Sequence, residues 1–240
     1  MKDLIRKILK EYEEEEKILV VPSLKYFGDD WNVLQLFLNS KGNPKWKLLD
    51  DLDLDNTPIE SLGNLISVGG YLYLNDTGIK SLDNLQSVGG YFFSNDTSIE
   101  SLGNLQYVGG DLDLENTIIK SLENLQSVGG NLYLYGASIE SLGNLQSVGG
   151  GLDLRNTQIE SLGNLISVGG YLDLKNTQIE SLGNLQSVGE DLDLNGTPIE
   201  SLGNLQHVGR YLDLRNTPIS KKYTEEEIRQ MVDVKENIYM

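Results

Sequence analysis

A period of twenty residues constrains the fold of this 240-residue chain more than any other feature of its sequence. The repeated unit is DLDLDNTPIESLGNLISVGG at residues 51–70, and it recurs without insertion through residue 210. A unit of this length cannot bury its own apolar side chains, so it packs against the units before and after it. The period therefore predicts a repeat solenoid, a single elongated array.

The repeat pattern divides the chain into three parts. Residues 51–219 hold eight and a half units, residues 1–50 are expected to form an N-terminal cap, and residues 220–240 a C-terminal helical cap. The spacing of apolar residues predicts an amphipathic helix over residues 1–17, and Thr224 with Glu227 predicts a capping box at the start of the last helix. Because a cap at each end opposes end-to-end association, we expect a monomer.

Each unit begins with five alternating residues, as in YLDLK at residues 171–175. This alternation predicts a short strand with two leucines pointing inward and the first, third and fifth positions pointing outward. Strands stacked about 4.8 Å apart would form one parallel sheet. The next apolar residues are spaced too irregularly for a strand and too briefly for a long helix. We therefore expect a return path of short turns or single helical turns.

Three positions of the repeat carry the same polar or small residue in all or nearly all units, and we call each such set of equivalent residues a column. A structural role explains each column best. An asparagine that never varies among the units is expected to be a buried amide that bonds backbone groups along the return path, since buried polar groups are paired. The threonine column is expected to do the same after the strand. The first glycine of each Gly-Gly pair also never varies, which indicates a positive φ or a close backbone approach. The asparagine column consists of Asn64, Asn84, Asn104, Asn124, Asn144, Asn164, Asn184 and Asn204.

The pattern Leu172-x-Leu174-x-x-Thr177-x-Ile179-x-x-Leu182-x-x-Leu185 resembles the leucine-rich repeat family over about residues 51–219. It is also similar to the L domains of growth-factor receptors and, more weakly, to uncharacterised repeat proteins of phages and bacteria. The resemblance implies a right-handed β-solenoid that binds proteins through the exposed face of its parallel sheet. Threonine replaces the interior asparagine of the family and Gly169 replaces its first leucine, so we expect an array straighter than a horseshoe.

Aromatic residues occupy outward strand positions in the N-terminal half of the array. Exposed tyrosines on adjacent strands can form a partner-binding patch, since they give a large contact area at low entropic cost. Cross-strand stacking that only protects the sheet is the alternative. The residues are Tyr71, Tyr73, Tyr91 and Phe93, with Tyr133 and Tyr135 two strands further on.

Carboxylates form a ladder in the central outward column of the C-terminal half, at Asp153, Asp173, Asp193 and Asp213. Four such groups at strand spacing repel one another, so the sequence requires something that offsets them. One possibility is a calcium ion, which prefers several carboxylate oxygens. The other, which we favour because glycine-rich calcium loops are missing, is diagonal pairing with Arg155, Lys175 and Arg215.

Composition and charge restrict the possible functions. The formal net charge of −17 should repel nucleic acid and anionic lipid, and it favours basic protein partners. The chain has no cysteines, and its acidic N-terminal segment is unlike a secretory signal, so we expect a cytoplasmic protein. His207 is the single histidine and has no evident nucleophile partner, so we expect no catalytic residues and no cofactor or metal.

These observations support one main hypothesis, a non-enzymatic protein–protein interaction module that uses the exposed sheet face. The alternative is a structural or spacer protein of a phage or cell-surface assembly. A calcium-binding solenoid is a minor alternative.

Overall fold

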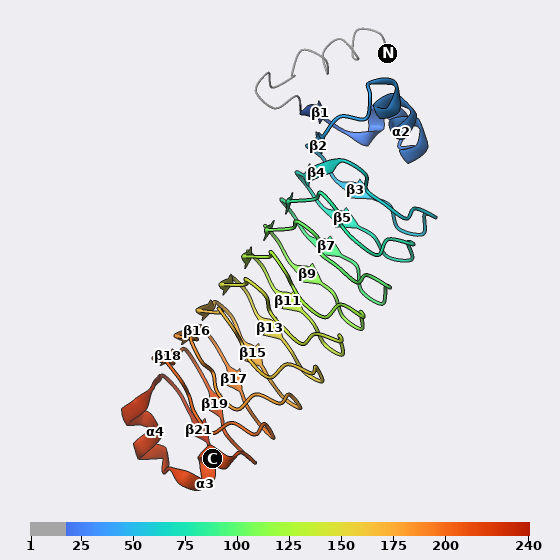
Figure 1. Cartoon of the computed structure of the whole chain (residues 1–240). Helices are drawn as coiled ribbons and strands as arrows, with labels where there is room; N and C mark the ends of the chain where they lie inside the picture. Colours follow the sequence, from blue (N-terminus) through green and yellow to red (C-terminus); the bar gives the residue numbers. More distant parts are fainter. Residues whose placement is uncertain (1–17) are drawn as a thin grey trace.

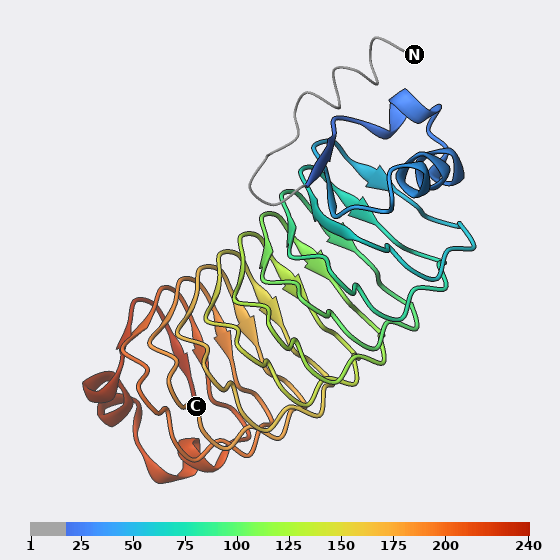
Figure 2. The same ribbon diagram turned by 45° about the horizontal axis from the view of Figure 1, so that its top comes forward.

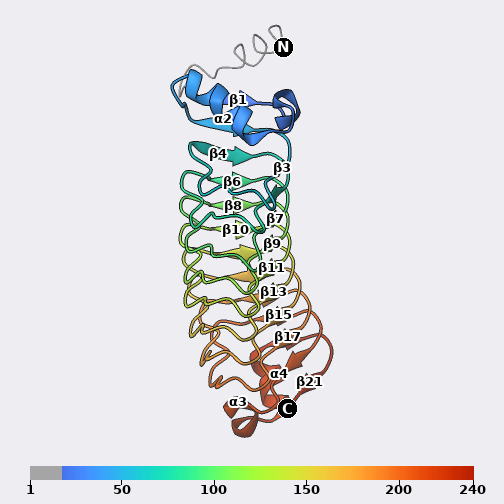
Figure 3. The same cartoon turned by 90° about the vertical axis from the view of Figure 1, so that its right-hand side faces the viewer.

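The computed structural model describes residues 18–240, which form a parallel β-solenoid of stacked coils (Figures 1 and 2). Neighbouring coils are twenty residues apart, since Leu52 pairs with Leu72 and the same register recurs along the stack. The coils follow one another along a single axis (Figure 3). This arrangement confirms the solenoid predicted from the period. The helix predicted for residues 1–17 lies outside the described residues.

The strand predicted at the start of each unit is present and pairs in parallel with the same strand of the next coil. We call the resulting sheet, which has ten strands within residues 18–240, sheet 1. The strands are β3 (Leu52–Asp53), β5 (Leu72–Tyr73), β7 (Phe92–Phe93), β9 (Leu112–Asp113), β11 (Leu132–Tyr133), β13 (Leu152–Asp153), β15 (Leu172–Asp173), β17 (Leu192–Asp193), β19 (Leu212–Asp213) and β21 (Ile238–Tyr239).

A second parallel sheet runs along the return path, so the expectation of one parallel sheet is incomplete. This sheet 2 has eleven strands within residues 18–240. The serine and valine before the glycine pair extend for only two residues, too short for an alternation to be recognised in the sequence. The strands are β1 (Leu19–Val21), β2 (Trp46–Leu48), β4 (Leu65–Val68), β6 (Ser87–Val88), β8 (Tyr107–Val108), β10 (Ser127–Val128), β12 (Ser147–Val148), β14 (Ser167–Val168), β16 (Ser187–Val188), β18 (His207–Val208) and β20 (Asp233–Val234).

The two sheets are joined by turns, and the structure has no helix between residues 51 and 217. Two positions in each coil adopt a positive φ, as Asn156 and Gly163 do at 58° and 57°. Asparagine, aspartate or glycine fills the first of these positions in every unit, which is the preference expected for a left-handed residue. The turns therefore owe their shape to these two positions, and single helical turns are absent from this part of the path.

The first glycine of the Gly-Gly pair is required for close backbone approach, the second of the two reasons proposed from the sequence. A Cβ atom added to Gly149 would lie only 2.1 Å from the carbonyl oxygen of Gly129 in the preceding coil. The backbone nitrogen of Gly149 donates a hydrogen bond to the carbonyl oxygen of Val128 at 2.8 Å. Glycine at this position therefore allows consecutive coils to stack.

The interior is a continuous column of leucine, isoleucine and valine side chains, which are almost fully buried in every full coil after the first. The threonine column supports it as predicted: the Thr157 hydroxyl donates to the carbonyl oxygen of Leu154 at 2.7 Å, closing the turn after the strand. In one coil Phe92 and Ser94 replace the two inward leucines, and both are buried. The core is thus shared between coils.

Helices stand at both ends of the array, as predicted for the caps. At the N-terminal end are η1 (Leu24–Phe27) and α2 (Trp31–Ser40), and at the C-terminal end α3 (Pro218–Lys222) and α4 (Glu225–Met231). The capping box of Thr224 and Glu227 is present at the start of α4. The end segments also add strands, because β1, β2 and β20 extend sheet 2 and β21 extends sheet 1. Among the helices of residues 18–240, none has the length and apolar character needed to cross a membrane.

Candidate functional site

The outward face of sheet 1 is where the units differ most. Its side chains come from the first, third and fifth positions of each coil, because the leucines between them point into the core. The face can be divided into an N-terminal half over residues 51–135 and a C-terminal half over residues 151–215. The two halves carry different chemistry on the same backbone.

Four aromatic rings form one continuous cluster in the N-terminal half, which we call the aromatic quartet. Tyr71 stacks on Tyr91 with ring centroids 5.0 Å apart and planes 11° apart. Tyr73 stacks on Phe93 at 5.4 Å, and the two stacks touch edge to face. The exposed fractions of Tyr71 and Tyr91 are 39% and 40%. The rings are therefore ordered by stacking and still accessible to a partner.

Three carboxylates lie on each side of the quartet, one group in the coil before it and one in the coil after it. Their grouping on both sides of the quartet becomes visible only when the outward positions are compared one coil at a time. None of the outward positions between residues 51 and 135 is lysine or arginine. We call these residues the flanking carboxylates: Asp51, Asp53, Asp55, Asp111, Asp113 and Glu115.

The pKa values around the quartet are raised first by burial and then by the neighbouring negative charges. Burial raises the pKa of Asp113, with the nearby Asp96 acting in the same direction. Burial and the charge of Asp113 also raise the pKa of Glu115 above its ordinary value. The pKa of Tyr73 is raised by burial and then by Asp51 and its neighbours. A cation placed on this face would favour the ionised forms of these groups and so oppose the three shifts.

Tyr133 and Tyr135 lie apart from the quartet, since the coil with Asp111, Asp113 and Glu115 separates them from it. Tyr135 is exposed, and the Arg155 guanidinium lies over its ring, 5.1 Å from the centroid. Tyr133 is half-buried. The structure therefore does not unite the six aromatic residues named from the sequence, and Tyr135 already has a cation partner within the chain.

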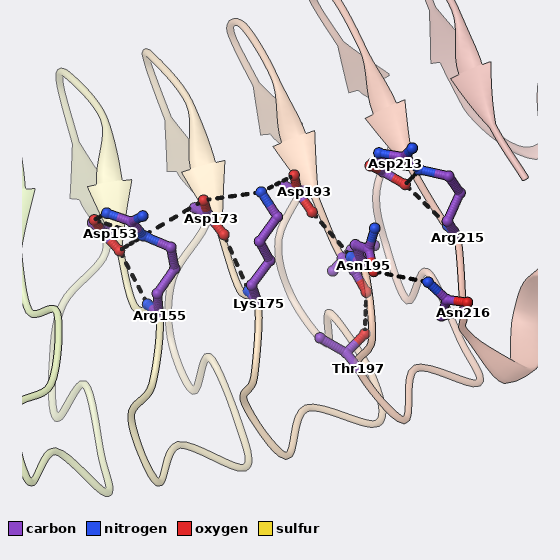
Figure 4. Close-up of polar contacts among 11 residues, drawn as sticks. Asp153, Arg155, Asp173, Lys175, Asp193, Asn195, Thr197, Asp213, Arg215 and Asn216 are labelled. Carbon is purple, nitrogen blue, oxygen red and sulfur yellow. Dashed lines mark hydrogen bonds and ion pairs between the residues drawn. The ribbon is translucent and has the colours of Figure 1, made fainter.

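The acidic ladder of the C-terminal half is laid out as predicted, with Asp153, Asp173, Asp193 and Asp213 in register on adjacent strands. Basic side chains lie two residues after three of these aspartates, at Arg155, Lys175 and Arg215, whereas Asn195 follows Asp193 (Figure 4). Arg155 pairs with Asp153 and reaches Asp173 at 3.6 Å from its Nε atom.

The same bridging continues along the ladder. Lys175 Nζ lies 2.6 Å from Asp193 and 3.7 Å from Asp173, and Arg215 pairs with Asp213. The diagonal pairing favoured from the sequence is therefore present for Arg155 and Lys175, whereas Arg215 pairs with the aspartate of its own strand.

The ladder carboxylates have a second function that the sequence did not reveal. Each accepts a hydrogen bond from the backbone nitrogen two residues later, as Asp173 does from Lys175 at 3.1 Å. Burial alone would raise the pKa of Asp213, but the hydrogen bonds from Arg215 outweigh it and hold that pKa below its ordinary value. Within residues 18–240, no group of three or more histidine, cysteine, aspartate or glutamate side chains is placed to hold a metal ion.

The asparagine column bonds backbone groups, but it does so at the surface and between coils. The side-chain nitrogen of Asn104 donates to the carbonyl oxygen of Asp83 at 2.9 Å, and Asn124 donates to Gly103 in the same way. Both asparagines are exposed, whereas the sequence argument treated the column as buried polar groups. These amides tie each turn to the turn of the preceding coil.

A cleft adjoins the first group of flanking carboxylates. It has a volume of about 420 Å³ and lies where η1 meets the first full coil. Lys25 is on its wall, and the pKa of Asp50 is lowered mainly by a hydrogen bond from Ser23. The lining residues are Ser23, Leu24, Lys25, Asp29, Asp50, Asp51 and Asp53.

A second groove, of about 360 Å³, runs along the side of sheet 2 and is lined mainly by uncharged amides. Its residues are Gln146, Asn164, Ile166, Asn184, Gln186 and Asn204. His207 is outside both clefts and pairs with Asp233 of β20, 3.0 Å from its Nδ1 atom.

Comparisons of the chain with protein-family models, with curated proteins and with solved structures gave no match. The functional assignment therefore rests on the outward face itself.

Proposed function

We propose that this protein is a non-enzymatic protein–protein interaction module that binds its partner through the outward face of sheet 1, with the aromatic quartet at the centre of the contact. The observation that supports this most strongly is the contiguity of four rings on two adjacent strands, of which Tyr71 and Tyr91 are exposed and Tyr73 and Phe93 half-buried. Tyrosine is among the residues that contribute most to binding at protein interfaces.

Cross-strand stacking and partner binding are compatible in this cluster. Stacking fixes the rings before a partner arrives, so little side-chain entropy is lost on binding. Tyr71 and Tyr91 keep about two fifths of their surface accessible, and each carries a hydroxyl group that can form hydrogen bonds. Rings that served only to protect the sheet would not need to concentrate in two neighbouring coils.

We also propose that the solenoid is related to the leucine-rich repeat family. Its support is the recurring pattern of inward leucines with parallel strands at the start of each unit. The Thr157 column and the second sheet distinguish this coil from the family's usual unit.

Affinity capture from the native source followed by mass spectrometry tests the interaction. The wild type is compared with a variant in which all four quartet residues are serine, and with a milder Tyr71→Ser/Tyr91→Ser variant. A matched control replaces Tyr107, Ile118 and Ile166, which are exposed on other sides of the solenoid, by serine. Circular dichroism establishes that each variant is folded.

We expect the quartet variants to lose proteins that the wild type and the control both retain. Recovery of the same proteins by all four would refute the proposal. Measuring size at several protein concentrations separates this function from the structural alternative, because a spacer whose sheet contacts itself would grow with concentration.

A further inference from the structure

Three outward tyrosines outside the aromatic quartet each have an arginine of this chain over the ring. Arg155 lies over Tyr135, Arg210 over Tyr211 and Arg215 over Tyr239, with centroid distances of 5.1, 5.0 and 5.4 Å. A guanidinium in this position is attracted by the electrons of the ring. In the described residues, no such cation lies over any ring of the aromatic quartet.

Carboxylates follow the same division. Each of the five outward aspartates in the C-terminal half lies within 4.0 Å of a basic side chain, Asp191 through Arg210 at 3.5 Å and the rest through the ladder pairs. The flanking carboxylates instead receive neutral donors, as Asp51 does from the backbone nitrogen of Tyr71 at 2.8 Å. No ion pair to any of the six is present within residues 18–240.

We infer that the partner supplies these missing cations, and that the segment bound across the quartet is an extended polypeptide with two basic side chains four residues apart and an apolar side chain midway between them. This inference rests on the proposed function. The basic side chains of the segment would pair with the flanking carboxylates, and its apolar side chain would pack against the rings of the quartet.

The spacing follows from the geometry of the coils. Three coil steps separate Asp53 from Asp113, which is roughly 14 Å at the usual distance between parallel strands. An extended chain rises about 3.3 Å per residue, so side chains four residues apart on one side are roughly 13 Å apart. The segment therefore runs along the solenoid axis, across the strands. The cleft beside Asp51 and Asp53, whose wall also carries Lys25, can receive one of the two basic side chains.

Fluorescence anisotropy with a labelled peptide tests this inference. The probe carries a central Lys-Ser-Leu-Ser-Lys in Gly-Ser flanks, and a comparison peptide of the same composition has its lysines adjacent. The probes are titrated with the full chain and with a neutralised variant that has Asn or Gln at the six flanking carboxylates. A matched control removes six charges from another side of the solenoid by placing Gln at Glu60, Glu100, Glu140, Glu160, Glu180 and Glu200.

We expect the spaced probe to bind the wild type and the control alike, and to bind the neutralised variant about tenfold more weakly. The comparison peptide should bind all proteins weakly. Equal losses in the neutralised variant and the control would show that only the net charge of −17 attracts the probe, and would overturn the inference.

A further variant addresses the basic residues of the chain's own first segment by replacing Lys2, Arg6, Lys7 and Lys10 with Gln. If the spaced probe bound only this variant, the chain itself would be the occupant and the inference would fail. Failure of all probes while the quartet variants still lose captured partners would leave the proposed function standing. Failure of both experiments would remove both proposals.

Discussion

The N-terminal and C-terminal halves of the sheet 1 face share one coil geometry and differ in how their charges are compensated. In the C-terminal half, Asp153 and its neighbours form ion pairs with Arg155, Lys175 and Arg215. In the N-terminal half, no basic side chain of residues 18–240 forms an ion pair with the six flanking carboxylates or lies over the aromatic quartet. The inward residues therefore set the coil, and the outward residues decide whether a half is electrostatically complete or is suited to a partner.

The largest expected effect tests whether the scaffold is the same in both halves. Gly109→Ala and Gly169→Ala each place a Cβ atom 2.1 Å from the carbonyl oxygen of the preceding coil's glycine. Because neither neighbour can move without shifting a whole coil, we expect each variant to lose about 3 kcal/mol of unfolding free energy. Urea denaturation followed by circular dichroism measures this.

Ser147→Ala is the control for the glycine variants, because it changes a half-exposed side chain in sheet 2 and should alter stability by less than about 0.5 kcal/mol. A large loss in one half with little in the other would mean that the halves do not share a scaffold. The comparison between them would then have to include the backbone.

The second effect concerns compensation of charge in the C-terminal half. Arg155→Met leaves the Asp153 carboxylate, whose residue is only 3% exposed, without its cation, and should cost about 2 kcal/mol. Adding Asp153→Asn should restore most of that loss, since the neutral amide can still accept the backbone N–H of residue 155. Thermal and urea unfolding of the two variants give the free energies. A double variant no more stable than the single one would contradict the ion-pair explanation.

The main features of the fold could be predicted because the repeat presents the same evidence eight times. The inward leucines, the Thr157 hydroxyl bond and the required first glycine all follow from invariance within the unit. The second sheet was missed because Ser167 and Val168 form a strand too short for a period to be visible. Positive φ was considered for the wrong glycine, although Asn156 and its equivalents marked the correct turn by residue type.

The candidate site was predictable only in part, because its meaning depends on neighbours across coils. The sequence identified the tyrosines and the Asp–Arg pairs, which lie within one or two units. The flanking carboxylates gain significance only when Asp53 and Asp113 are seen on either side of the stacked rings. The prediction that the asparagine column is buried was wrong, because an invariant amide such as Asn104 can bond backbone groups equally well at a surface turn.

A smaller effect separates stability from binding in the two halves. Tyr91→Ser removes one member of a stacked pair and should lower the free energy of unfolding by about 1 kcal/mol. The same variant should also lose partner capture. Tyr171, whose pKa is raised by burial to about 12, covers Gly151 in the other half. Tyr171→Ser should cost a similar amount while capture is retained. If both variants lost capture, the partner would contact the whole outward face of sheet 1 and not the quartet alone.

The smallest effect is a pH dependence of opposite sign at two carboxylates, Glu115 in the N-terminal half and Asp213 in the C-terminal half. Burial raises the pKa of Glu115 above its ordinary value of 4.5, so the folded state holds this proton more tightly than the unfolded state does. The destabilisation is therefore present at neutral pH and disappears as the pH falls through the raised pKa. Since the group is largely solvent-screened, Glu115→Gln should be more stable than the wild type by about 0.3 kcal/mol at pH 7, and equal to it near about pH 4.

Asp213 provides the opposite case for the same measurement. Its pKa lies below the ordinary value of 3.8 because hydrogen bonds from Arg215 outweigh burial, so its ionised form stabilises the folded state above that value. Asp213→Asn should therefore be less stable than the wild type at pH 7, and the difference should shrink as the pH falls through the lowered pKa. Urea denaturation of both variants across the pH range gives the two differences. If both had the same sign at pH 7, the flanking carboxylates would be compensated after all, and the partner would have no unmet charge to bind.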